Sequence, residues 1–192
     1  MQEFIALFKE AIFEDDVYLR PINIHENNED LIIIFTVSLY DTNDVIQKWK
    51  VTCNDFHDYR FILDFVDDIN LFSDHVLLWE TNQKQCELYY RGSITDRNEL
   101  IGALYNKHKE IMRGWIDLDH FINQKLDWLF QGELGLVATG PNELINEYKK
   151  IFEERSLSAS IIPSWREPHK KKLIVFGKSY VIAEDFKFEL CE

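Results

Sequence analysis

The strongest constraint on the fold is the apolar segment LIIIFTVSLY at residues 31–40. Every second residue from Leu31 to Leu39 is apolar, and this period places side chains on one face of a β-strand. The opposite face also begins apolar, with Ile32 and Ile34. A strand that is apolar on both faces belongs in the interior of a sheet. We therefore expect a neighbouring strand on each side of this segment.

Two flanking segments are candidates for those neighbours. Residues 17–25 are expected to form an edge strand, because Pro21 lacks the N–H that a central strand needs. Residues 45–53 return to an alternating pattern. Polar turns at 27–30 and 41–44 separate the three segments, so the sequence predicts an antiparallel meander.

The middle of the chain follows the helical period, and the end returns to strands. A hairpin of residues 75–80 with 85–92 is expected before the central helices, and an apolar connection at 133–139 between two of them. At the end of the chain, strands are expected at 157–162, 173–176 and 179–183, with a turn at Gly177-Lys178, and at 186–190. The expected helices are 4–12, 55–67, 96–115 (opened by the capping pair Asp96 and Glu99), 119–130 and 141–152.

This order of elements predicts the fold class. Strands at both ends with helices between them indicate an α+β fold rather than a regular βαβ alternation. We expect a mainly antiparallel sheet, built from N- and C-terminal strands. It would pack against a central group of about three helices and an N-terminal helix. Because 192 residues suit one domain, the chain is expected to form a single α+β domain over residues 1–192.

Charge is spread unevenly along the chain. The net charge is −13, and residues 1–68 carry 15 acidic and 5 basic side chains. Such a surface repels phosphate backbones, so no nucleic-acid partner is expected. It would attract a basic protein, although the same charge could serve solubility alone.

Cysteine usage and apolar segments point to a compartment. Cys53, Cys86 and Cys191 are odd in number and far apart, so neither a disulfide framework nor a zinc site is expected. The N-terminus lacks the basic region of a signal peptide, and no apolar run is long enough for a membrane span. We expect a cytoplasmic protein that does not enter membranes.

Catalytic signatures are missing from the sequence. It contains no glycine-rich phosphate loop, no G-x-S-x-G elbow and no H-E-x-x-H pair. We therefore predict no catalytic residue, no metal and no cofactor, and an enzyme is the less favoured class. The alternative is a small-ligand-binding protein or hydrolase. Its site would lie near His108, His120 and Asp117, or around Asp74 and His75.

Each of these positions also has a purely structural interpretation. His108 falls on an apolar helical stripe, where a histidine is usually a hydrogen-bonded core residue. Asp74 is suited to a turn hydrogen bond. The carboxylates of Asp55, Asp58, Asp64, Asp67 and Asp68 are expected to form a solvated face.

The most unusual segment is the loop PSWREPHKKK at residues 163–172. Tryptophan and arginine are the residues that most often carry binding energy, so this loop suits a recognition tip. In the alternative interpretation, Trp165 folds onto the core and the lysines neutralise the acidic half of the chain. The candidate binding residues are Trp165, Arg166, His169, Lys170 and Lys171.

In size and charge the chain resembles small bacterial inhibitors and immunity proteins. Those proteins mask basic toxins or nucleases by charge complementarity. The resemblance implies an acidic protein-interaction module with a basic protein partner. It is carried by charge and length, and no motif adds to it. The oligomeric state is left open.

Overall fold

The computed structural model describes residues 17–62, 66, 68–123, 125 and 129–191. The expected N-terminal helix at 4–12 lies outside these residues. The chain divides into two compact units, each described here by itself. Unit 1 comprises Met1–His75 and Lys170–Glu192, and unit 2 comprises Val76–His169. A single domain over 1–192 would require the two units to fold together. The division into units does not test this, so the single domain stays a prediction.

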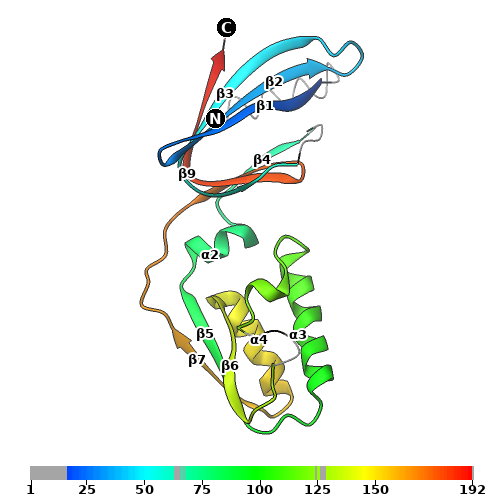
Figure 1. The fold of residues 1–192 in the computed structure, drawn as a ribbon, viewed down its shortest axis with the longest axis vertical. Coiled ribbons are helices and arrows are strands. Elements are labelled where there is room, and N and C mark those ends of the chain that lie inside the picture. Colours follow the sequence, from blue (N-terminus) through cyan, green and yellow to red (C-terminus); the bar gives the residue numbers. More distant parts are fainter. Residues whose placement is uncertain (1–16, 63–65, 67, 124, 126–128, 192) are drawn as a thin grey trace. The chain divides into compact units, whose positions relative to one another are not determined.

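Unit 1 contains a six-stranded sheet whose neighbouring strands are all antiparallel (Figure 1). Its order is β1-β2-β3-β9-β8-β4. The N- and C-terminal strands therefore share one sheet, joined where β3 pairs with β9. The strands are β1 (Val17–Asn27), β2 (Asp30–Leu39), β3 (Val45–Arg60), β4 (Ile69–Phe72), β8 (Lys172–Phe176) and β9 (Ser179–Cys191).

The alternating pattern of β2 places its apolar face in the core of unit 1, as predicted. Leu31, Ile33, Phe35 and Val37 are all buried, and β2 has a strand on each side. The predicted meander of β1, β2 and β3 is also confirmed. So is the β8–β9 hairpin, whose last pair, Phe176 and Ser179, brackets the predicted turn. Val66 adds an isolated antiparallel bridge to Leu19 of β1.

The predicted helix at 55–67 is wrong at its start, because β3 continues to Arg60. The β3–β9 register slips between Phe56 and Asp58, so residue 57 is an extra residue in β3. In a regular strand, side chains on one face are two residues apart. A β-bulge of this kind increases that spacing to three residues at the bulge. Phe56 and Tyr59 therefore lie on one face, with ring centroids 5.7 Å apart. A spacing of three imitates a helix in the sequence.

Unit 2 contains a three-stranded antiparallel sheet of order β6-β5-β7. Helix α4 packs on all three strands and against α3 (Figure 1). The helices thus pack on a second sheet, within their own unit. The prediction of one sheet, built from N- and C-terminal strands, did not include this second sheet. The elements are η1 (Val76–Leu78), α2 (Trp79–Asn82), β5 (Gln85–Arg91), α3 (Arg97–Met112), η2 (Leu118–His120), β6 (Leu134–Pro141), α4 (Asn142–Glu154) and β7 (Ser158–Pro163).

Two of the three predicted central helices are confirmed as α3 and α4. Asp96 is the N-cap of α3, and its side chain accepts a hydrogen bond from the backbone N–H of Glu99 at 2.9 Å. Pro141 immediately precedes α4, where its missing N–H costs nothing. The strand predicted at 157–162 is confirmed as β7.

Two other predictions for this unit are wrong, and a third is wrong at its start. Residues 76–82 form η1 and the short α2, so β5 pairs with β6 and β7 instead of a hairpin partner. The helix predicted at 119–130 is wrong at its start, where the described residues hold the end of η2 and a bridge between Ile122 and Ala138. The expected connection at 133–139 is mostly strand β6. Its apolar run suits a strand as well as a loop, and pairing with β5 decides between them.

The chain is thus of mixed α+β class with mostly antiparallel sheets, as predicted. Among the described residues, no helix combines the length and apolar character needed to cross a membrane.

Candidate functional site

The loop after β7 carries the most exposed large hydrophobic side chain among the described residues. Trp165 is 95% exposed, and Arg166 and His169 beside it are also exposed. The alternative interpretation, in which Trp165 folds back onto the core, does not match this exposure. Tryptophan is enriched at protein interfaces, where a partner covers its ring.

Two backbone hydrogen bonds fasten residues 164–169 of this loop to the rest of unit 2. The N–H of Ser164 donates to the carbonyl of Gln85 at 2.7 Å, and that of His169 donates to the carbonyl of Thr81 at 2.8 Å. Between them, the hydroxyl of Ser164 accepts from the N–H of Arg166 at 3.1 Å. Trp165 therefore stands on a loop anchored to the scaffold.

The lysines that follow belong to unit 1, and they have different environments. Lys170 is exposed. Lys171 forms an ion pair with Asp55 and also donates to the Asp55 carbonyl at 2.9 Å. Lys172 pairs with Asp185 at 2.7 Å and helps to lower the pKa of that carboxyl. Two lysines thus neutralise acids of their own unit. Of the five candidate binding residues, Lys171 is engaged in this way, while the other four are exposed.

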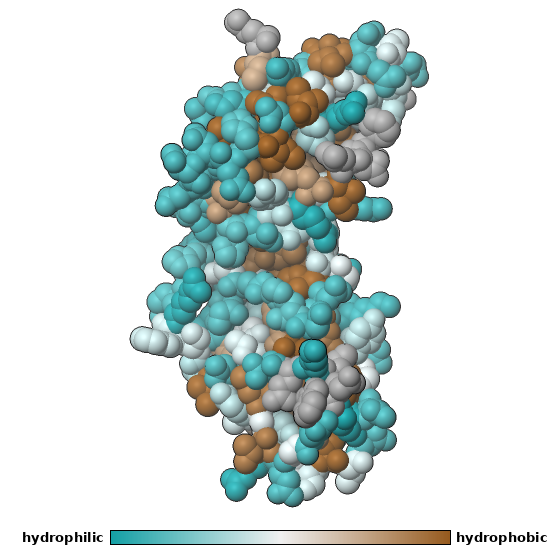
Figure 2. Space-filling view, viewed as in Figure 1, coloured by the Kyte–Doolittle hydropathy of each residue, from teal (hydrophilic) through white to brown (hydrophobic). Residues whose placement is uncertain are grey.

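Figure 2 shows the hydropathy of one face of the molecule. Hydrophilic side chains cover most of that face, with smaller hydrophobic groups between them. By sequence, unit 1 carries 20 acidic and 10 basic side chains, and unit 2 carries 14 and 11. The balances are −10 and −3, so most of the net charge belongs to unit 1.

His108 is a buried core residue, as its place on the apolar stripe indicates. It is 4% exposed. Its Nδ1 lies 2.7 Å from the hydroxyl of Tyr148, and its Nε2 lies 2.8 Å from the carbonyl of Ile116. A carbonyl can only accept, so Nε2 carries the proton and Nδ1 accepts from Tyr148. Both ring nitrogens are thereby engaged within the core.

The other members of the predicted His108 site do not converge into a metal centre. His120 lies 3.0 Å from the carboxylate of Glu80 in an exposed pair. Asp117 precedes η2 and makes no side-chain cap there. Among the described residues, no three of the His, Cys, Asp or Glu side chains are placed to share a metal ion.

The remaining polar candidates have structural surroundings. His75 lies against Phe72, with ring centroids 5.3 Å apart, and Asp74 precedes η1 rather than a strand. Asp58 accepts from the hydroxyl of Tyr180 at 2.8 Å. Asp68 accepts from the N–H of Gly177 at 3.1 Å. Asp64 and Asp67 lie outside the described residues.

Two of the three cysteines, Cys53 and Cys86, have the environments expected of inert thiols. Cys53 and Cys86 are buried and free, and Cys191 is half-buried. Burial raises the pKa of the Cys53 thiol to about 12. A thiol that stays protonated is a poor nucleophile, so Cys53 acts as a small core residue.

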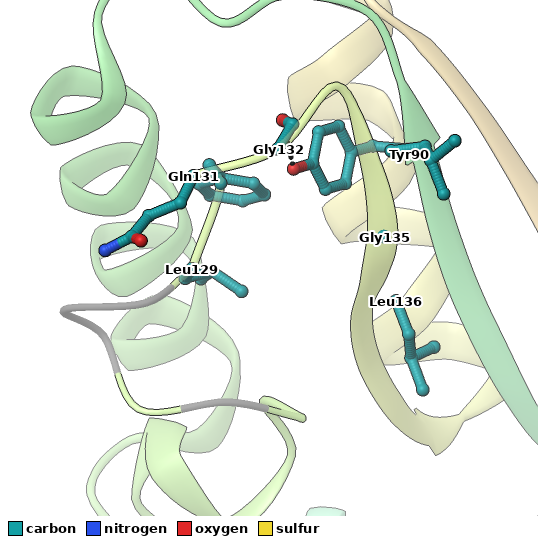
Figure 3. Close-up of a pocket in the computed structure, with 8 residues that line it drawn as sticks. Tyr90, Leu129, Gln131, Gly132, Gly135 and Leu136 are labelled. Atoms are coloured by element: carbon teal, nitrogen blue, oxygen red, sulfur yellow. Dashed lines mark hydrogen bonds between the residues drawn. The ribbon is translucent and has the colours of Figure 1, made fainter.

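Unit 2 also contains a small cavity of about 210 Å³ that no sequence pattern indicated. Figure 3 shows Tyr90 reaching across it to donate to the Gly132 carbonyl, at 2.7 Å. A Cβ at Gly135 would lie 3.2 Å from the Tyr90 ring, so glycine permits this close approach. Among the described residues of the lining, Tyr90 alone is titratable, and its hydroxyl is already hydrogen-bonded. The lining residues are Tyr90, Leu129, Phe130, Gln131, Gly132, Leu134, Gly135 and Leu136.

Comparisons of this chain with models of protein families, with curated proteins and with solved structures found no match.

Proposed function

We propose that this chain is a protein-interaction module of the inhibitor or immunity type, and that Trp165 is its main recognition residue. The observation that carries the proposal is the 95% exposure of this indole. A partner that covered the ring would remove a large apolar area from water at low entropic cost, since the indole has two side-chain torsions. Binding energy commonly concentrates at such residues.

The surroundings of Trp165 support this role. Hydrogen bonds at Ser164 and His169 hold the loop to β5 and α2. A held loop loses less conformational entropy on binding than a loose one. Arg166 stands beside the indole and can pair with a carboxylate of the partner.

Charge supports a basic partner. Unit 1 carries a balance of −10, which raises the local concentration of a cationic protein and its rate of association. In this proposal the charge of unit 1 governs the rate of association, and Trp165 governs the lifetime of the complex. The unpaired, buried Cys53 and Cys86 suit a reducing compartment, so we place this function in the cytoplasm.

Photo-crosslinking in a lysate of the source cells tests the proposal. A photoreactive residue replaces Glu167, which is exposed next to the loop tip, or Lys109, which is exposed on α3. We expect a discrete protein adduct from position 167, weaker at high salt, and none of the same mass from position 109. Failure to obtain an adduct specific to position 167 would contradict the proposal.

Substitution of the indole provides the quantitative arm. With the captured partner purified, Trp165→Ala is expected to weaken binding about 30-fold or more, the range of an interface hot spot. Trp165→Phe retains an aromatic ring and should lose less. Leu190→Ala, at an apolar residue of β9 that is 60% exposed, is the control and should leave affinity unchanged. Equal affinity of Trp165→Ala and the parent would overturn the role of the indole.

A further inference from the structure

The two edges of the three-stranded sheet in unit 2 differ in whether another segment pairs with them. The outer edge of β6 is covered by the segment Phe121–Asn123. Asn123 donates its N–H to the Val137 carbonyl at 3.0 Å, and Thr139 donates to the Phe121 carbonyl at 2.9 Å. On the outer side of β7, no described residue forms a strand pair. Figure 1 shows β7 at the margin of this sheet.

The register identifies which backbone groups of β7 point outward. Ser164 donates its N–H to Gln85, which makes these two residues a hydrogen-bonded pair. In an antiparallel ladder such pairs recur at every second residue. Ser158, Ser160 and Ile162 therefore turn their N–H and C=O groups toward β5. Ala159 and Ile161 turn theirs outward.

The sequence of β7 lacks most of the devices that protect an edge. Protected edges carry charges, bulges, prolines or a cover, or are very short. The strand SASIIP has no charge, and its register with β5 has no bulge. Its one proline, Pro163, lies at the end and marks where the open edge stops. In unit 1, by contrast, β1 has a register shift after Pro21 and a bridge to Val66, and β4 has four residues.

We propose that β7 pairs with β7 of a second copy of this chain, antiparallel, about a two-fold axis at Ser160. The two outward-facing residues lie symmetrically on either side of Ser160. Each outward N–H therefore meets an outward carbonyl when the strand pairs with itself, and a two-fold interface requires such self-complementarity. The two sheets then form one continuous sheet. This dimer does not depend on Trp165.

Side chains and charge favour a second copy as the occupant. Ala159 and Ile161 pack into their own core, so Ser158, Ser160 and Ile162 face the opposite side of the sheet. In the pair, Ser160 lies opposite its symmetry mate, and Ile162 lies opposite Ser158 of the other copy. Ile162 is 53% exposed and gains cover there. Unit 2 has a balance of only −3, so repulsion between two copies of it is weak.

Light scattering and sedimentation of the full chain test the proposal. At the two-fold axis each Ser160 lies opposite its symmetry mate, and like charges directly opposite each other destabilise a strand pair. We expect a concentration-dependent dimer. Ser160→Lys and Ser160→Glu should each be monomeric, with an apparent dissociation constant raised at least 10-fold. A mixture of these two variants should restore the dimer, because opposite charges then meet at the axis. Ser160→Thr should dimerise like the parent. Ser160 is exposed, so all three variants are expected to fold, which circular dichroism checks.

Three results would overturn the proposal. A parent protein that stays monomeric at its highest attainable concentration would exclude self-pairing of β7. A strand of another protein would then be the candidate partner for this edge. A dimer that neither charged variant weakens would place the interface elsewhere. A mixture of Ser160→Lys and Ser160→Glu that stays monomeric would exclude the two-fold axis at this residue.

Discussion

At the scale of single residues, His108 shows how unit 2 accommodates a titratable group in its core. Burial lowers the pKa of the ring below its ordinary value of 6.5, although the Ile116 carbonyl and the nearby Asp117 and Asp119 act in the opposite direction. The ring is therefore neutral near pH 7. Its two hydrogen bonds satisfy both nitrogens, so the histidine serves packing rather than proton transfer.

A pH dependence of stability follows from this lowered pKa. Between pH 6.5 and the folded-state pKa, the unfolded chain binds a proton at His108 and the folded chain does not. The free energy of unfolding should therefore fall as pH decreases below 6.5, by at most about 1.4 kcal/mol per pH unit from this group. Chemical denaturation at a series of pH values measures the slope. His108→Gln cannot titrate, so its slope should be smaller, and an unchanged slope would contradict the assignment.

At the scale of elements, the sequence predicted strands and long helices well where one period persists. The alternation in β2 and the capped helix α3 are local patterns, and both are confirmed. The bulge in β3 was not predictable, because the extra residue changes the period from two to three within a single strand. Segment 133–139 was ambiguous for a different reason. It becomes a strand because β5 is available as a partner.

The candidate site shows the same difference between features set by local sequence and features set by contacts between distant residues. Trp165, Arg166 and His169 are close in sequence, so composition alone could single out their loop. The open edge of β7 could not be found in this way. It depends on which strands pair with β5, and on the cover that Phe121–Asn123 provides for β6. Those contacts join residues far apart in the chain.

The close packing of that cover on β6 gives a prediction. A Cβ at Gly140 would lie 2.8 Å from Cδ1 of Phe121, whose side chain is 2% exposed and has little room to move. Gly140→Ala should therefore lower the free energy of unfolding by about 1–3 kcal/mol, the usual effect of overpacking. Thermal or urea denaturation measures it.

The matched control is another glycine of unit 2. In the middle of α3, a Cβ at Gly102 would meet nothing within 4 Å. Gly102→Ala should raise stability by about 0.5–1 kcal/mol, because alanine favours the helix. Destabilisation by both substitutions alike would show that the Phe121 contact is not the cause.

At the scale of the whole molecule, the sequence of unit 2 is inserted between strands β4 and β8 of unit 1. Strands β4 and β8 are antiparallel neighbours, and Phe72 pairs with Leu173, yet about 100 residues separate them in the sequence. A short turn would suffice to join two such strands. The N- and C-terminal strands can share a sheet because the chain leaves unit 1 and re-enters it at adjacent positions.

Each unit has its own hydrophobic core, and this determines how the molecule should unfold. One buried cluster draws all its members from unit 1, and the other draws all of its members from unit 2. Leu104 of α3 is 1% exposed in the second cluster. Leu104→Ala should cost unit 2 about 2–5 kcal/mol, the usual loss for a buried leucine. Because the cores are separate, unit 1 should keep its stability.

Hydrogen exchange of the full chain, resolved by segment, measures both units at once. We expect Leu104→Ala to accelerate exchange in α3, α4 and β5 while β2 and β3 keep their protection. Ile33→Ala, at a buried residue of β2, is the reciprocal control and should do the opposite. If either substitution lowered protection in both units equally, the chain would unfold as one cooperative body. That result would confirm the single domain predicted from the sequence.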